Sequence, residues 1–215
     1  NTQKHGVDFE AVFATVVKLV SIRIVLAIAA AHDWGLWQLD IKQAFLQADV
    51  HEPLYMRMPP NLPSANAKGE QLVCRLRKSL YGLKQAAREW SERLASVLLR
   101  FGFRRGVIDT CVYRYDEAAT GHTVLLLVYV DDIIMAYSHE AVRLKVMDYL
   151  NAELPVDDRG ELQWILRMEV RRDRSSRTIS LSQQQYSEKL VDRYLPPEGV
   201  LREYDSPLDE ESHPL

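Results

Sequence analysis

The sequence predicts an α+β fold in which helices back an antiparallel sheet. Apolar residues recur at helical spacing near both ends and in the middle of the chain, and runs of strand-forming residues lie between these segments. Two apolar runs flank Val130-Asp131-Asp132 and predict a hairpin, which is an antiparallel unit. The 215 residues suffice for one large domain or for a domain with a smaller lobe.

The predicted helices combine apolar spacing with signals at their ends. Asp8 and Ser138 are expected to act as N-caps, and Gly102 to end the helix that follows Gly82. The first helix is apolar enough to be largely buried. In chain order the predicted helices are residues 9–31, a brief one at 43–48, the segment that ends before Gly102, residues 139–150 and residues 182–194.

The predicted strands are short and are bounded by turn residues. Residues 36–41 indicate an interior strand that carries a carboxylate, Asp40, near its end. The other predicted strands are residues 54–58, 71–76, 110–115, 123–129 and 133–137. Two further strands are expected, one before and one after a turn at 173–177. An exposed loop over residues 59–69 joins two of them, and residues 196–215 indicate an acidic linker.

Composition excludes several classes of protein. With 47% hydrophobic and 27% charged residues, the chain is typical of a soluble globular protein. The apolar stretch at residues 24–31 is too short to span a bilayer and no signal-peptide pattern precedes it, so no membrane is expected as a partner. The two Cys and six His residues lack the spacing of a zinc site.

Charge is unevenly placed along the chain. The net charge is -3, but residues 72–105 hold nine Lys or Arg against two Glu, whereas residues 196–215 hold six acids and one Arg. The basic segment has two interpretations, a solvated helix face or a surface that contacts nucleic acid. Charge alone does not separate them.

Three carboxylates at strand ends carry the chemical information. Asp131 and Asp132 follow an apolar run, and burying such a pair is costly unless a cation or hydrogen bonds compensate. The alternative is a turn in which both acids face water. Asp40, at the end of another apolar strand, favours a divalent metal site, because hard oxygen ligands suit magnesium. Two such ions can activate an attacking hydroxyl and neutralise a leaving pyrophosphate.

Three sequence blocks then point to one family. They are Leu-Asp-Ile-Lys-Gln-Ala-Phe at residues 39–45, Ser-Leu-Tyr-Gly-Leu-Lys-Gln-Ala-Ala-Arg-Glu-Trp at 79–90, and Tyr-Val-Asp-Asp at 129–132. In this order they resemble the copia-type retrotransposon reverse transcriptase, over roughly residues 9–195. The resemblance implies a right-hand polymerase palm, an antiparallel sheet backed by helices, with a partial fingers lobe. It assigns residues 1–34 and 49–80 to the fingers, 35–48 and 81–170 to the palm, 171–195 to the end of the palm or the start of the thumb, and 196–215 to the linker.

The resemblance also implies roles for individual residues. The catalytic residues would be Asp40, Asp131 and Asp132, which would hold two Mg²⁺ ions with the backbone carbonyl of Ile41. Phe45 would lie under the sugar of the incoming deoxynucleoside triphosphate, beside the nucleotide-binding residues Gln85 and Gly82. Tyr129, Lys84 and Arg88 would contact nucleic acid. The expected partners are an RNA or DNA template with its primer, and the integrase and ribonuclease H regions of a parent polyprotein, in a cytoplasmic virus-like particle.

Two departures from the family pattern keep a second hypothesis open. Where the family usually has Phe-Leu-Gly in the strand that supports the primer, this chain has Ile165-Leu166-Arg167. The basic fingers strand that family members carry before the position of Asn1 is also absent from this sequence. The alternative is a non-catalytic relic that retains the fold and binds nucleic acid. A nucleotidyl cyclase-like palm would use similar acids, but the block around Gln85 argues against it.

Overall fold

The structure is a computed structural model that describes residues 3, 6 and 14–194. Within these residues helices and antiparallel strands alternate irregularly, which confirms the predicted α+β class. The helices are α1 (Leu19–Ala31), the 3-10 helix η1 (Ala44–Gln47), α2 (Ala86–Phe101), α3 (Glu140–Glu153) and α4 (Gln184–Tyr194). The strands are β1 (Gly35–Ile41), β2 (Tyr55–Arg57), β3 (Val73–Arg75), β4 (Arg104–Arg105), β5 (Val112–Asp116), β6 (Thr123–Tyr129), β7 (Asp132–Tyr137), β8 (Val156–Glu161), β9 (Trp164–Ile165), β10 (Met168–Asp173) and β11 (Thr178–Ser182).

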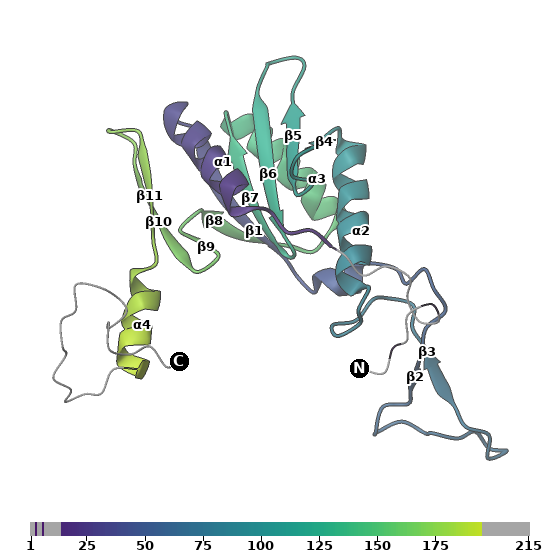
Figure 1. The fold of residues 1–215 in the computed structure, drawn as a ribbon. Coiled ribbons are helices and arrows are strands. Elements are labelled where there is room, and N and C mark those ends of the chain that lie inside the picture. Colours follow the sequence, from purple (N-terminus) through teal and green to yellow (C-terminus); the bar gives the residue numbers. More distant parts are fainter. Residues whose placement is uncertain (1–2, 4–5, 7–13, 195–215) are drawn as a thin grey trace.

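A six-stranded sheet forms the centre of the fold. Its strand order is β4-β5-β6-β7-β1-β8, and each neighbouring pair is antiparallel. Helix α1 packs against β7 from one side of the sheet, and α3 packs against β6 and β7 from the other (Figure 1). The β9-β10-β11 sheet with α4, and the β2-β3 hairpin, extend away from opposite ends of this centre (Figure 1).

The core explains why the central strands form. Residues 124–128 of β6 are all buried, because helices cover both faces of this strand and an unbroken run of Val and Leu suits such a position. Each fully buried Leu contributes roughly 1.5 to 3 kcal/mol relative to an exposed one. The polar ends of β6 and β7 therefore project from a rigid base.

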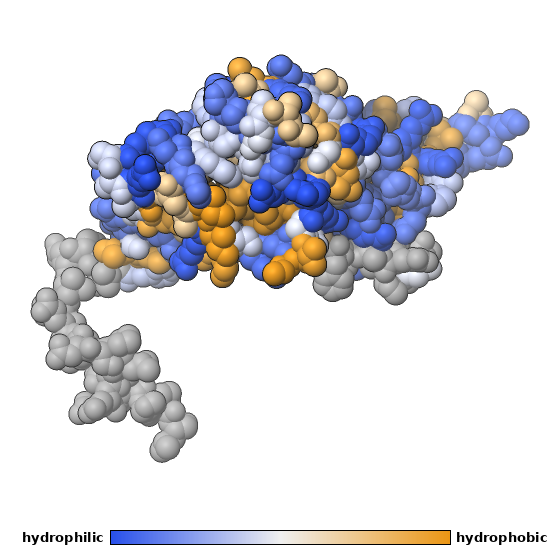
Figure 2. Space-filling model, turned by 90° about the horizontal axis from the view of Figure 1, so that it is seen from above, coloured by the Kyte–Doolittle hydropathy of each residue, from blue (hydrophilic) through white to orange (hydrophobic). Residues whose placement is uncertain are grey.

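Helix α1 begins later than predicted. Residues 14–18 are not helical, and the predicted cap, Asp8, lies outside the described residues. The amide of Val17 instead donates to the carbonyl of Val128, which holds this segment beside β6. The prediction that α1 is largely buried was also wrong, because Val20 and Ile24 are 64% and 55% exposed. Apolar side chains reach the surface among hydrophilic ones in Figure 2.

Other differences from the predicted elements have local causes. The cap of α3 is His139 rather than Ser138, because the imidazole of His139 accepts a hydrogen bond from the amide of Ala141. Strand β8 was not predicted, since its sequence is polar. The predicted stop at Gly102 is confirmed, with a φ of 112° that glycine adopts without strain. None of the helices in residues 14–194 is long and apolar enough to cross a membrane.

Candidate active site

The three predicted acids gather where β1 meets the β6–β7 hairpin. Asp40 of β1 and Asp132 of β7 are direct register partners, so their side chains lie on the same face of the sheet. Tyr129 of β6 is the partner of Asp132 on its other side and shares this face. Directly opposed residues of this kind have Cβ atoms about 4.5 to 5.5 Å apart. Asp131 occupies the turn next to Asp132.

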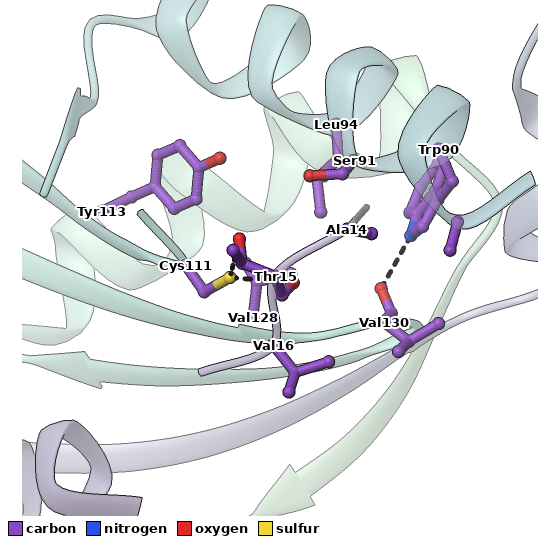
Figure 3. Close-up of a pocket in the computed structure, with 11 residues that line it drawn as sticks. Ala14, Thr15, Val16, Trp90, Ser91, Leu94, Cys111, Tyr113, Val128 and Val130 are labelled. Atoms are coloured by element: carbon purple, nitrogen blue, oxygen red, sulfur yellow. Dashed lines mark hydrogen bonds between the residues drawn. The ribbon is translucent and has the colours of Figure 1, made fainter. Parts of the chain in front are cut away.

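The turn between β6 and β7 is tight and strained. It contains only Val130 and Asp131, because Tyr129 and Asp132 are paired on either side. Val130 has a φ of 58°, which is rare for a β-branched residue. The carbonyl of Asp131 accepts from the amide of Ile41 at 2.9 Å. The carbonyl of Val130 accepts from the indole Nε1 of Trp90 at 2.7 Å (Figure 3).

The acids repel one another in this arrangement. Burial raises the pKa of Asp132, and the charges of Asp131 and Asp40 act in the same direction, while Gln38 opposes them. Burial also raises the pKa of the Tyr81 phenol, and the negative charges of Asp131 and Asp40 raise it further. The phenol of Tyr81 therefore lies within the field of the acids, a placement that the sequence blocks did not indicate.

Strand β8 adds charged groups that sequence reasoning missed. Asp157 is the register partner of Asp40 on the side opposite to β7. Arg159 Nη2 lies 3.1 Å from a carboxylate oxygen of Asp157 and 3.7 Å from one of Asp40. Lys42 Nζ lies 3.6 Å from Oδ1 of Asp157. The polar sequence of β8 has no alternating apolar pattern, so nothing in it indicated a strand beside Asp40.

The donor atoms suit magnesium without forming a complete cage. Among the residues that the structure describes, no three Asp, Glu, His or Cys side chains are arranged to hold a metal ion. Asp40 and Asp132 nevertheless face each other and Asp131 adjoins them. Magnesium is usually held by one or two carboxylates and completes its octahedron with water and substrate phosphates. The carboxylate oxygens therefore fit this ion chemically.

Three neighbouring pockets, here together called the carboxylate groove, lie beside the acids and along β8, β9 and α4. Trp164 is shared by its neighbouring sections, and Arg167 extends it to Lys189 of α4. Near the acids it is lined by Gln38, Asp40, Asp132, Arg159, Glu161 and Trp164, and further along by Tyr129, Leu166 and Arg167.

A model of one protein family matches residues 1–195, and its description is reverse transcriptase (RNA-dependent DNA polymerase). The chain belongs to this family.

Relatives of this reverse transcriptase chain are parts of much longer proteins. It is 38% identical over 192 residues to the "Retrovirus-related Pol polyprotein from transposon TNT 1-94" of Nicotiana tabacum. It is 37% and 35% identical over 191 residues to the corresponding polyproteins from transposons RE1 and RE2 of Arabidopsis thaliana. These matches cover 89% of the chain but only 13 to 14% of each relative. They confirm the copia-type resemblance.

The predicted nucleotide-binding residues of the reverse transcriptase differ in their exposure to solvent. Phe45 is half-buried, and its ring lies 4.6 Å from that of Tyr81, centroid to centroid. Gln85 is 3% exposed, and its side-chain oxygen accepts a hydrogen bond from Gln3. Gly82 is exposed, with a φ of 95°.

The predicted basic contacts lie at the N-terminal end of α2. Lys84 is exposed, and its backbone amide donates to Gln3. Arg88 is half-buried and pairs with Glu92 at 2.8 Å on the same helix. The side chain of Gln85, between them, is buried, so in this structure it is not accessible to a nucleotide.

Proposed function

We propose that this chain carries the polymerising centre of a copia-type RNA-directed DNA polymerase. The observation that carries the proposal is the pairing of Asp40 with Asp132 beside the Asp131 turn, in a chain of the reverse transcriptase family. In this view the six-stranded sheet with its helices is the palm, and the β2-β3 hairpin belongs to the fingers. The β9-β10-β11 sheet and α4 form the end of the palm and the start of the thumb.

The acids of the proposed centre act as ligands and as positioned charges. Asp40, Asp131 and Asp132 would hold two Mg²⁺ ions together with the carbonyl of Ile41. Such ions polarise the attacking 3′-hydroxyl and neutralise the leaving pyrophosphate. The protein contributes the fixed spacing of β1 and β7, and burial that raises the pKa of Asp132 favours a cation beside it.

The carboxylate groove supports a path for the template and primer. Arg167 and Lys189 line its outer part, and phosphate contacts of this kind bind any sequence, as a polymerase requires. Tyr129 lines the groove beside Asp132 and would contact the primer end. Lys84 and Arg88 would meet the template backbone, and Phe45 would exclude a ribose 2′-hydroxyl by steric overlap.

The relatives indicate in what kind of parent protein the chain is expected to work. Because they are Pol polyproteins that are several times longer, we expect integrase and ribonuclease H regions in the parent protein. The substrates would be an RNA or DNA template, a primer and deoxynucleoside triphosphates, inside a cytoplasmic virus-like particle.

Primer extension on an RNA template by the longer parent protein tests this function. Asp131→Asn should lower the extension rate by at least about 100-fold, since even outer-shell support of a metal site is often worth 10- to 100-fold. Its melting temperature without metal should be equal or higher, because one charge leaves a repulsive group. Asp148→Asn, an exposed change on α3, is the control and should extend normally. A variant that loses activity only by unfolding would remove Asp131 from the centre.

Two features favour the non-catalytic alternative. Arg159 already lies 3.7 Å from Asp40, and Arg167 has a φ of 65° in the β9–β10 turn, where the family usually has glycine. A relic would bind template and primer without extending them. Replacing Lys84 and Arg88 by Ala should then still weaken binding of all sequences and flatten its salt dependence by up to about two phosphate contacts. Binding without extension by the parent protein would decide for the relic.

A further inference from the structure

Both peptide carbonyls of the acidic turn are held from outside the hairpin. Ile41 of β1 donates to the carbonyl of Asp131, and Trp90 of α2 donates to the carbonyl of Val130. Trp90 is 1% exposed, so its indole N–H has no access to water. A buried donor that loses its acceptor is energetically costly, and this cost keeps the contact in place.

The Trp90 contact fixes the central peptide of the turn. The carbonyl of Val130 and the amide of Asp131 belong to one planar unit, so holding the first sets the direction of the second. Of the two turn residues only Val130 has a positive φ, which matches a type II′ turn. Rotation of this peptide by half a turn would give a type I′ turn, in which Asp131 also has a positive φ.

Strain makes the turn dependent on this support. Turns of type II′ normally have glycine at the first central position, and valine there is sterically unfavourable. Strained conformations of this kind persist only where surrounding structure holds them. Val130 lines an apolar cavity together with Trp90, Leu94 and Val128, and its carbonyl points toward the indole N–H of Trp90 (Figure 3).

We propose that Trp90 is a positioning residue whose indole N–H locks the Val130–Asp131 peptide and thereby aims the Asp131 carboxylate. The burial of Trp90 places it in the core, and its polar contact gives it a second role. The catalytic consequence rests on the proposed function of Asp131, whereas the conformational consequence does not.

Trp90→Phe tests the proposal, because phenylalanine keeps an aromatic ring and removes the donor. Trp37→Phe is the matched control, since the indole of Trp37 also donates a side-chain bond, to Asp158. In this chain, nuclear magnetic resonance should show slow exchange of the Trp90 indole proton. The Asp131 amide resonance should move in Trp90→Phe and stay in place in Trp37→Phe.

Kinetics of the parent protein separate positioning from packing. Trp90→Phe should lower kcat by about 10- to 100-fold with little change in the KM for deoxynucleotides, because a carboxylate misplaced by about 1 Å affects the reacting complex most. A purely structural role predicts a lower melting temperature with unchanged kcat. That result, or a fast-exchanging Trp90 indole proton, would overturn the proposal. If the unsubstituted parent does not extend primers, the proposed function fails, and the resonance of Asp131 still decides whether Trp90 holds the turn.

Discussion

Replacing Asp109 should destabilise the fold, because this carboxylate caps α1 from a distant part of the chain. One of its oxygens accepts hydrogen bonds from the amide of Lys18 at 2.9 Å and the hydroxyl of Ser21 at 2.6 Å. The other accepts from the amide of Cys111 at 3.0 Å. Asp109 is 7% exposed, so water cannot replace these bonds readily. The side chain of Lys18, the N-cap residue itself, makes no capping hydrogen bond to α1.

The expected loss of stability depends on which hydrogen bonds of Asp109 an asparagine can still accept. Asp109→Asn keeps the shape but turns an NH2 group toward at least one of the three donors and removes the charge. Losing one charge-assisted bond costs about 1.5 to 3 kcal/mol. For a chain of this size each kcal/mol shifts the melting temperature by about 2 to 4 °C, so a fall of about 3 to 12 °C is expected.

The pH dependence gives a second, independent check. Burial opposes ionisation of Asp109, but the bonds from Ser21, Lys18 and Cys111 outweigh it and lower the pKa below the ordinary 3.8. A lowered folded-state pKa stabilises the protein above the unfolded-state value, and this contribution is lost as pH falls through the folded-state value. The difference between wild type and Asp109→Asn should therefore be constant from neutral pH to about pH 5 and narrow only below about pH 4.

Thermal unfolding followed by circular dichroism over this pH range measures both quantities. Asp148→Asn serves as the control, because it removes one charge from an exposed position of α3. Equal melting temperatures for Asp109→Asn and wild type at neutral pH would refute the capping argument. A difference that already narrows well above pH 5 would show that another group is responsible.

Three further substitutions follow from the same reasoning. Burial raises the pKa of Glu89 above 4.5 and outweighs the hydrogen bond with Ser79, which lowers it, so the stability of the fold falls as pH rises and Glu89 loses its proton. Glu89→Gln should therefore raise the melting temperature at neutral pH and change it little near pH 4.5, as thermal melts would show. Arg167→Gly should increase the free energy of unfolding in urea by about 1 kcal/mol, because glycine adopts the left-handed backbone of this position without strain. It should also weaken the salt-dependent binding of primer and template. Phe45→Val should raise the ratio of ribo- to deoxynucleotide kcat/KM; an unchanged ratio in a destabilised variant would leave Phe45, beside Tyr81, with a packing role only.

The sequence predicted those elements whose local signals agree with their surroundings. Strand β6 has the predicted bounds, because its run of Val and Leu suits a strand covered on both faces. Helix α2 ends at the predicted Gly102. The start of α1 was not predictable, since its apolar pattern continues toward the N-terminus while Asp109, far along the chain, fixes where the helix begins.

The sequence predicted the acids of the candidate site but not the side chains that surround them. Carboxylates at the ends of apolar strands stand out because burial is costly, and Asp40 and Asp132 indeed became register partners. Long or aromatic side chains that reach the site from other elements leave no such signal. The local sequence around Tyr81 indicates only a loop, and that around Trp90 only a buried helix face. The sequence around Arg159 indicates only a polar stretch.

The unpredicted side chains change how the acids must be understood. Asp40 lies between two carboxylates, Asp132 on β7 and Asp157 on β8, and such a row is unfavourable without cations. Arg159 and Lys42 supply two positive charges on long, flexible side chains at its β8 side. The β7 side, where Asp131 and Asp132 adjoin, receives no comparable ion pair within residues 14–194. In the proposed centre a divalent cation would therefore offset most repulsion at Asp131 and Asp132, and at Asp40 it would compete with Arg159.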